Sequence, residues 1–457
     1  MKRFFLILFA SVAAFSAVHA QTPKYVFYFI GDGMGMNHAY AAQAFNKATG
    51  AGDLNFFTFP VKAVVTTYSA SSLVTDSSAA GTALASGTKI NSNALGVDPQ
   101  GANTVPFTEI AKRNGWGTGV ITSVGVNHAT PASFYGHAAD RNSFDTLSRQ
   151  LIDADFVDFC AGSTFLTQRG SDKDNDYWVG EARRAGIKVY LGEYEPTKDR
   201  RVIMLNSDPT KSSLEYAIDR KDGDTRLADF TSAAIDYLSN NFRKGFFLMV
   251  EGGKIDYAAH AQDAATTVRE TIDMAESVQL ALDFAAKHPN ETLIIVTADH
   301  ETGGFSMGSG RYEMHPEMLA NQKCSKDVLT AKITKLRKDN EVVEWRQVKE
   351  LLGEELGLWN EVPVSKRAEK ALTEVYKDFF LDYEEGNVRN LYSSNDRMTV
   401  AAIEHLEKSA AMMTFPFGSH SGAPVMLYAF GARATEFATC MDNTDIPNTL
   451  VKVTKLK

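Results

Sequence analysis

Val74–Ala85 reads V-T-D-S-S-A-A-G-T-A-L-A and gives the first indication of both the fold and the chemistry of this chain. Asp76 and Ser77 precede a run of small residues, and Ser and Asp are favoured at helix N-termini. A helix N-terminus attracts anions, because its N–H groups are unpaired and carry partial positive charge. Ser77 is therefore either a nucleophile open to an anionic substrate or an N-cap serine of an Ala-rich helix. Residues elsewhere in the chain are needed to decide between these two interpretations.

The composition is that of a globular protein: 457 residues, 44% hydrophobic and 23% charged. The net charge of −9 argues against nucleic-acid binding, and it requires that any phosphate site be made locally positive by metals or arginine. The three cysteines are far apart and allow at most one disulfide; they are Cys160, Cys324 and Cys440. Since there is no Cys-x-x-Cys motif, a metal site would have to use His, Asp and Glu.

Residues 1–20 have the pattern of a signal peptide. Lys2 and Arg3 precede an apolar run, and small residues before Gln21 predict cleavage at that point. The run is too short for a comfortable membrane span, and no later stretch is long and apolar enough to cross a bilayer. We therefore expect a secreted, periplasmic protein whose mature chain is residues 21–457.

Short apolar runs rich in aromatic and β-branched residues alternate with helical patterns after the leader. The predicted strands are Tyr25–Ile30, Val61–Tyr68, Gly117–Thr122, Ile187–Leu191, Arg201–Leu205, Phe246–Val250, Leu293–Ala298 and Val425–Phe430. Helices are expected at Leu227–Phe242 and His260–Lys287. This alternation predicts an α/β fold with a mostly parallel central sheet and helices on both faces.

Metal-type side chains follow three of the predicted strands. Asp32, Glu251 and the pair Asp299–His300 each lie just past the C-terminal end of an apolar run. Open α/β sheets bind ligands at this edge. The coincidence of three such positions predicts one polar site there.

Residues 311–410 differ from the rest of the chain, because charged residues are dense and helical periodicity replaces strands. Leu352, Leu356 and Trp359 have helical spacing and could form an apolar face. We interpret this region as a mostly helical insertion that rejoins the core near Phe415. It is either a lid or dimer contact, or a solvated appendage without a catalytic role.

Asp256 and His260 give the sharpest local signal for metal binding. They are four residues apart at the expected start of a helix, so both can face one ion. Histidine and carboxylate are zinc ligands in open catalytic sites. His420 lies between small residues in G-S-H-S-G and is a further candidate ligand. Taken singly, each of these residues also has a purely structural interpretation, since short motifs recur by chance.

Together these motifs resemble the alkaline phosphatases, over Tyr25–Gly310 and Phe415–Gly431. The matching motifs are G-D-G-M-G around Asp32, T-D-S ending at Ser77, H-A-T-P beginning at His128, Arg141 thirteen residues later, V-E-G-x-x-I-D-x-x-x-H from Val250 to His260, T-A-D-H ending at His300, and H-S-G beginning at His420. The resemblance implies the alkaline phosphatase fold and hydrolysis of phosphate monoesters through a phosphoserine at Ser77. It also implies that Arg141 binds two phosphate oxygens, and it makes a homodimer one option for the assembly.

The resemblance further implies two zinc ions and one magnesium ion. The implied ligands of the first zinc are Asp256, His260 and His420, those of the second are Asp32, Asp299, His300 and Ser77, and those of the magnesium site are Asp32, His128, Thr130 and Glu251. Two cations about 3.5–4 Å apart can stabilise both the attacking and the leaving oxygen of an in-line displacement. The planar guanidinium of Arg141 suits the remaining phosphate oxygens.

Three residues depart from the usual pattern of this family. Tyr257 stands where many bacterial members carry lysine, and others histidine or tryptophan, so we expect altered phosphate affinity and release. His128 stands where some relatives carry aspartate, which leaves the identity of the third metal open. Ser78 follows Ser77 and is an alternative hydroxyl, although the D-S spacing favours Ser77.

Other functions remain to be weighed against a phosphomonoesterase. A sulfatase would need a [C/S]-x-P-x-R motif, which Ser77–Gly81 lacks. Phosphodiesterases of the same superfamily usually lack the third metal site and the arginine, whereas Thr130, Arg141 and Glu251 are all present here. A metal-binding or phosphate-binding protein without turnover would have no need of a serine at a helix start.

Overall fold

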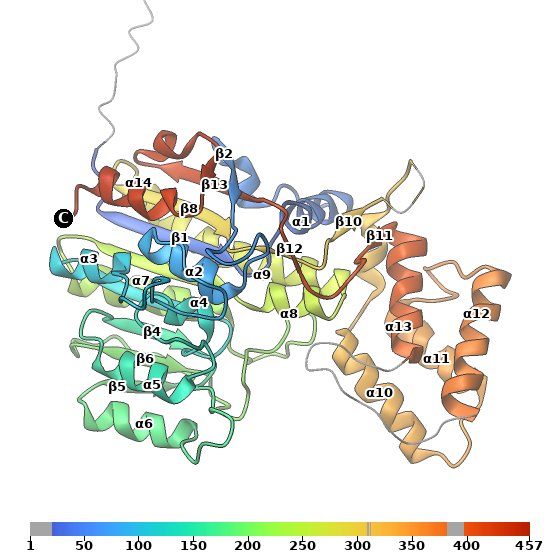
Figure 1. The fold of residues 1–457 in the computed structure, drawn as a ribbon. Helices are drawn as coiled ribbons and strands as arrows, with labels where there is room; N and C mark the ends of the chain where they lie inside the picture. Colours follow the sequence, from blue (N-terminus) through green and yellow to red (C-terminus); the bar gives the residue numbers. More distant parts are fainter. Residues whose placement is uncertain (1–20, 309, 311, 382–396) are drawn as a thin grey trace, which may run out of the picture.

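The core of the protein is one large sheet. A computed structural model describes residues 21–308, 310, 312–381 and 397–457, and within them a ten-stranded sheet has the order β14-β2-β13-β8-β1-β7-β3-β4-β6-β5 (Figure 1). The strands are β1 Tyr25–Gly31, β2 Val61–Thr66, β3 Gly117–Thr122, β4 Phe159–Gly162, β5 Lys188–Leu191, β6 Val202–Leu205, β7 Phe246–Gly252, β8 Thr292–Ala298, β13 Val425–Gly431 and β14 Met441–Asp442. Only β13 runs antiparallel to its neighbours in this sheet. The predicted mostly parallel α/β sheet is thus confirmed.

Strand β1 lies in the middle of the sheet, with β7 on one side and β8 on the other. Its sequence Y-V-F-Y-F-I-G is apolar without alternation because both faces are covered, and all of its residues after Tyr25 are buried. Gly31 is in register with Gly252 of β7 and Ala298 of β8. The C-terminal ends of these three strands therefore meet at one edge.

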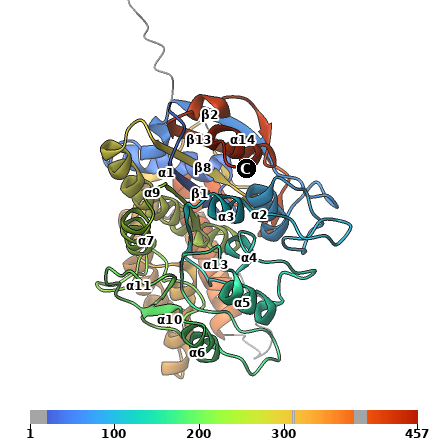
Figure 2. The same cartoon turned by 90° about the vertical axis from the view of Figure 1, so that its left-hand side faces the viewer.

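Helices cover both faces of the sheet. They are α1 Met36–Ala48, α2 Ser77–Ser86, α3 Phe107–Arg113, α4 Ala129–Ala132, α5 Phe144–Asp153, α6 Asn175–Arg184, α7 Leu227–Asn241, α8 Lys254–His260, α9 Ala264–Lys287 and α14 Asp445–Thr454. Figure 2 shows α7 and α9 on one face, and α2, α3 and α4 on the other. Helix α7 packs on β3 and β7, and helix α9 packs on β7 and β8. Helices α3 and α4 pack on β3 and β7 from the opposite face of the sheet.

Two local expectations need correction. The helix expected over His260–Lys287 begins only at Ala264, and His260 is instead the last residue of α8, because Gln262 has a left-handed φ of 56° and Asp263 caps α9 by accepting the N–H of Thr266. Strands β4 and β14 were not predicted, since F-C-A-G contains no β-branched residue and Met441–Asp442 is only two residues long.

A helical segment leaves the sheet region through β10 (Ser306–Met307) and returns through β11 (Met413–Thr414), which pair antiparallel. It contains η2 Pro316–Asn321, α10 Lys326–Asp339, α11 Trp345–Leu356, α12 Lys366–Tyr376 with the π-helical turn Lys377–Leu381, and α13 Arg397–Glu404 with the π-helical turn His405–Ala411. These helices enclose a hydrophobic cluster of their own, and they extend to one side of the sheet (Figure 1).

Of the three residues expected to form a helical apolar face in this segment, only two lie on a helix. Leu352 and Leu356 are fully buried on α11, but the helix ends at Leu356, because Gly357 adopts a left-handed φ of 69°. Trp359 lies beyond this end with a φ of 65° and packs against Trp345 instead.

The described residues include no helix that has both the length and the apolar character needed to cross a bilayer. The predicted signal peptide, residues 1–20, lies outside the described residues. All three cysteines are free thiols, and Cys160 and Cys324 are buried whereas Cys440 is exposed.

Candidate active site

The edge formed by β1, β7 and β8 gathers buried carboxylates. Asp32, Glu251 and Asp299 are each 0% exposed. The backbone N–H of Gly33 donates to Asp299 Oδ1 at 3.0 Å, and the hydroxyl of Thr122 donates to Glu251. Three acids at one point in the interior need compensating positive charge or protons.

Gly33 allows the close approach of these groups. Its φ is +70°, and a Cβ at this position would lie only 2.8 Å from Asp256 Oδ1 and from Thr302 Oγ1. A side chain here would therefore displace groups on two other elements, so that only glycine fits.

Asp256, His260 and His420 form the first group of candidate metal ligands. His260 Nε2 lies 3.2 Å from Asp256 Oδ2 and 3.1 Å from His420 Nε2. Each imidazole places its Nδ1 against a main-chain carbonyl, that of Gly418 at 2.7 Å for His260 and that of Thr75 at 3.0 Å for His420.

These carbonyls fix the tautomer of both rings, because a carbonyl only accepts hydrogen bonds. In its neutral form each ring then carries its proton on Nδ1 and directs an unprotonated Nε2 at the other ring. Two facing lone pairs repel each other unless a cation lies between them. A carbonyl behind each ring is also the usual support of a metal-ligating histidine. The donor set thus fits a metal ion.

Asp32, Asp299 and His300 form the second group. His300 Nε2 lies 3.3 Å from Asp32 Oδ1, 3.4 Å from Asp299 Oδ2 and 3.2 Å from Ser77 Oγ. Burial keeps the pKa of His300 well below its usual value, so the ring is neutral and free to act as a ligand.

The electrostatics of this second group favour a bound cation. Burial, followed by the negative charges of neighbouring acids, raises the pKa of Asp32 well above its usual value, and burial does the same for Asp299. Within the described part of the chain, neither carboxylate oxygen of Asp32 receives a hydrogen bond. Orphaned buried oxygens of this kind call for a partner that the protein itself does not supply.

Asp32 also belongs to a third group, with His128 and Glu251. Burial raises the pKa of Glu251 to about 7, while the hydrogen bond from Thr122 opposes the rise. Burial lowers the pKa of His128 to about 3, so this ring is also neutral. The Tyr257 ring lies edge-on to His128, with 6.1 Å between ring centroids.

Ser77 is the first residue of α2, and Asp76 is its N-cap. The Asp76 carboxylate accepts the N–H groups of Ser78 and Ala79 and, at 2.5 Å, the Ser78 hydroxyl. The cap therefore engages the Ser78 hydroxyl, whereas Ser77 Oγ faces His300. Ser77 is 2% exposed and Ser78 0%.

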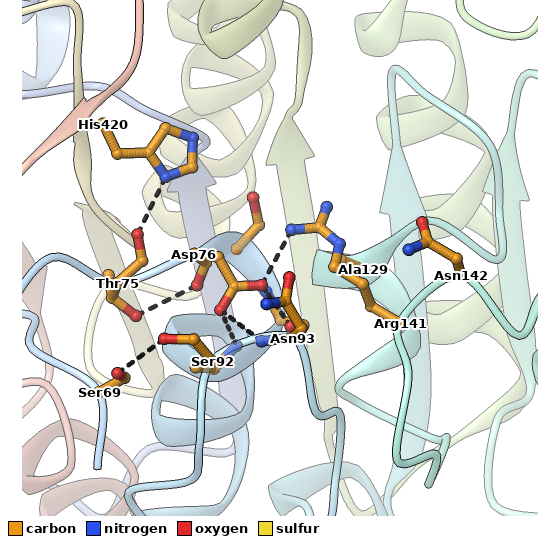
Figure 3. A network of polar contacts seen from close by, with 12 residues as sticks. Ser69, Thr75, Asp76, Ser92, Asn93, Ala129, Arg141, Asn142 and His420 are labelled. Carbon is orange, nitrogen blue, oxygen red and sulfur yellow. Dashed lines mark hydrogen bonds and ion pairs between the residues drawn. The ribbon is translucent and has the colours of Figure 1, made fainter. Parts of the chain in front are cut away.

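Arg141 reaches the site from a loop and is held by the same carboxylate. Its Nη1 donates to Asp76 Oδ2 at 3.1 Å (Figure 3). Its Nη2 lies 3.5 Å from His128 Nε2. Burial opposes ionisation of Asp76, but the bond from Ser78 and the charge of Arg141 outweigh it and hold the pKa of Asp76 below its usual range. An ionised Asp76 thus fixes the guanidinium beside the start of α2.

A sequence model of the alkaline phosphatases matches residues 23–158 and 206–456. The chain belongs to the alkaline phosphatase family. Alkaline phosphatase 3 of Bacillus subtilis is 31% identical over 440 residues, which cover 94% of this chain and 88% of the relative. Alkaline phosphatase 4 of the same organism is 30% identical over 395 residues, covering 84% of this chain and 77% of the relative.

Solved alkaline phosphatase structures share the fold over nearly the whole chain. The cold-active enzyme from a psychrophilic Shewanella superposes with a TM-score of 0.77 at 26% identity, covering 94% of this chain and 99% of that one. The Thermus thermophilus enzyme gives a TM-score of 0.76 at 26% identity, covering 99% and 96%. This member of the family is accordingly a phosphatase.

The structure also shows supporting residues of this alkaline phosphatase family member that the sequence did not identify. Thr302 donates its hydroxyl to Asp256 Oδ1 at 2.6 Å and lies 3.3 Å from His300 Nδ1. Asp76 was recognised as a helix cap but not as the partner of Arg141. Neither role has a local signal, because each depends on contacts between distant parts of the chain.

Proposed function

We propose that the protein hydrolyses phosphate monoesters through a phosphoserine intermediate at Ser77, with two zinc ions and a third, magnesium-type site. The observation that carries the proposal is the place of Ser77 Oγ, 3.2 Å from His300 Nε2 at the N-terminus of α2. A serine used only as a helix cap would not need to face a candidate metal ligand, and here the cap is Asp76.

The donor sets support the assignment of the metals. Two groups combine imidazole nitrogen with carboxylate oxygen, as zinc prefers; they are Asp256, His260 and His420, and Asp32, Asp299 and His300 with Ser77. The third group would use Asp32, His128, Thr130 and Glu251. Its carboxylate and hydroxyl oxygens are compatible with magnesium, but it contains one imidazole, as the second group does, so the donor set leaves the identity of this ion open. Bound cations would supply the positive charge that favours an ionised serine and stabilises developing negative charge on phosphate oxygens.

The protein's own residues account for the remaining steps. The Ser77 oxygen attacks phosphorus in line with the ester oxygen, which leaves as the phosphorus–oxygen bond of the ester breaks. Arg141 holds two of the other phosphate oxygens with its planar fork. A water molecule then attacks the phosphoserine, releasing phosphate and restoring the Ser77 hydroxyl.

The test compares the wild-type protein with Ser77→Ala. We expect the substitution to lower kcat/KM for an aryl phosphate by on the order of a thousandfold or more, because a covalent intermediate can no longer form. The phosphoenzyme should be detected on the Ser77 peptide by mass spectrometry after acid quenching. Metal content measured on the same samples should show zinc and a third, lighter ion, and chelation should abolish turnover.

Ser86→Ala is a matched control on the same helix, since the Ser86 hydroxyl donates to the Thr82 carbonyl at 2.8 Å. Full activity of Ser77→Ala combined with loss on chelation would contradict the phosphoserine route. A parallel loss in Ser78→Ala would then point to the neighbouring hydroxyl, and turnover of diesters to a phosphodiesterase.

The predicted leader in residues 1–20 supports a periplasmic location for this activity. Cell fractionation of the full-length chain should place the phosphatase in the periplasm and show Gln21 as the mature N-terminus.

A further inference from the structure

Asn93 adopts a strained main-chain conformation next to the phosphatase site. Its φ is +66°, a left-handed value that glycine and asparagine tolerate best. The residue is exposed on the loop between α2 and α3, and Figure 3 shows it between Asp76 and Arg141.

The main chain of Asn93 joins both of these residues. Its N–H donates to Asp76 Oδ1 at 3.1 Å, and its carbonyl accepts the N–H of Arg141 at 2.8 Å. The Arg141 guanidinium in turn donates to Asp76 Oδ2 at 3.1 Å. Three hydrogen bonds therefore close a ring that fixes Arg141 relative to the start of α2, where Ser77 lies.

The flanking residues hold this loop in place on both sides. Ser92 N–H donates to Ser71 Oγ at 3.0 Å, and the hydroxyls of Ser92 and Ser69 lie 2.9 Å apart. Leu95 and Ala138 exchange two main-chain hydrogen bonds of 2.9 and 2.7 Å. Because Ser92 on one side and Leu95 on the other are anchored, a change of φ at residue 93 cannot be absorbed by moving the loop as a whole.

We propose that Asn93 is a positioning residue for phosphate, whose left-handed conformation sets the spacing between Ser77 and Arg141. The inference rests on the proposed function, in which both residues contact the phosphoryl group. In the part of the chain that the structure describes, the Asn93 side-chain amide makes no hydrogen bond. The requirement is therefore for a backbone conformation and not for the amide group, so glycine should substitute and a β-branched residue should not.

The experiment measures the Ki for inorganic phosphate and the kinetics of an aryl phosphate in metal-loaded protein. We expect Asn93→Val to raise the phosphate Ki and the KM by about tenfold with a much smaller change in kcat, because displaced Arg141 binds phosphate less well. Asn93→Ala should give a smaller rise, and Asn93→Gly should stay within about twofold of wild type.

Two comparisons separate positioning from general strain. Lys455→Val introduces the same strain at another exposed residue with a left-handed φ, 57°, and should lower the Tm without changing the phosphate Ki. In an Arg141→Ala background, Asn93→Val should raise the Ki no further, since the group it positions is already absent.

An unchanged phosphate Ki in Asn93→Val and Asn93→Ala, beside an active wild type, would overturn the inference, as would full additivity with Arg141→Ala. If Asn93→Val does not fold, the phosphate Ki of Asn93→Ala, alone and combined with Arg141→Ala, is judged by the same criteria. A wild-type protein that neither binds phosphate nor hydrolyses the ester would instead refute the proposed function, and the inference with it.

Discussion

The hydroxyl of Thr302 contacts candidate metal ligands of two groups. Fully buried, this residue contacts Asp256 of the first ligand group and lies beside His300 of the second, while its N–H donates to the Gly33 carbonyl at 3.2 Å. Partners behind metal ligands orient them, and their loss typically costs 10–100-fold in metal affinity. We expect Thr302→Val to weaken zinc binding by about that factor and Thr302→Ser to retain most of it. Zinc release into a competing chelator measures the change.

A matched control is Thr297→Val on β8, where a buried threonine donates to the Met426 carbonyl at 3.1 Å. Loss of this buried hydrogen bond should lower the free energy of unfolding by about 1–3 kcal/mol. The rate of zinc release should not change. Indistinguishable release curves for Thr302→Val and wild type would show that the hydroxyl does not orient the ligands.

Helix α2 can lie close to α4 because residue 81 has no side chain. A Cβ on Gly81 would lie 2.8 Å from Ser133 Oγ and 3.4 Å from Thr130 Cα. We expect Gly81→Val to push α2, with Ser77, away from the α4 residues of the third group. The free energy of unfolding should fall by about 1–3 kcal/mol, the usual effect of overpacking, and kcat/KM should fall with it. Urea unfolding and steady-state kinetics on one preparation measure both.

The same substitution at Gly180 in α6 provides the comparison. There the nearest atom to an added Cβ is Arg184 Nη1 at 3.5 Å, an ordinary contact. Gly180→Val should change stability by less than about 1 kcal/mol, because valine is the better helix former. Equal losses at the two glycines would mean that the packing of α2 on α4 is not the cause.

The elements of this fold were largely predictable, whereas several of its contacts were not. Every predicted strand is present in the structure. The central ones are continuous apolar runs because both of their faces are covered, as in Tyr25–Gly31, whereas β2 alternates between buried and exposed residues. The break between α8 and α9 depends on one left-handed residue, Gln262, which no periodic pattern shows. The contacts of His420 with Thr75 and of Arg141 with Asp76 join segments far apart in sequence, so they follow from the tertiary structure alone.

On the scale of the whole molecule, folding buries three acids where their ionisation is unfavourable unless a cation binds. Asp32, Glu251 and Asp299 are fully buried at one edge of the sheet. A ligand that binds only the folded state stabilises it by about 4 kcal/mol when its free concentration is a thousand times Kd. Chelation should therefore lower the Tm markedly, and zinc with magnesium should restore it; calorimetry at fixed pH measures both changes. A Tm that does not respond would show that these acids do not hold metals.

The pH dependence of the metal-free protein follows from Glu251. Burial raises its pKa from 4.5 to about 7, so between these values the folded state keeps a proton that the unfolded state has lost. Stability of the metal-free protein should therefore fall as pH rises from about 4.5 to 7. Glu251→Gln should make this decline shallower, and metal-loaded protein should not follow it, since a cation favours the ionised acid.

Asp32 is the one carboxylate common to the second and third ligand groups. An ion bound by the second group would use one Asp32 oxygen and so would change how Asp32 can coordinate an ion in the third group. Occupancies of the two positions are consequently linked, and linkage is reciprocal: whatever the first ion does to the affinity for the second, the second does to the first. The metal composition of the centre would then be set jointly by the supply of both elements.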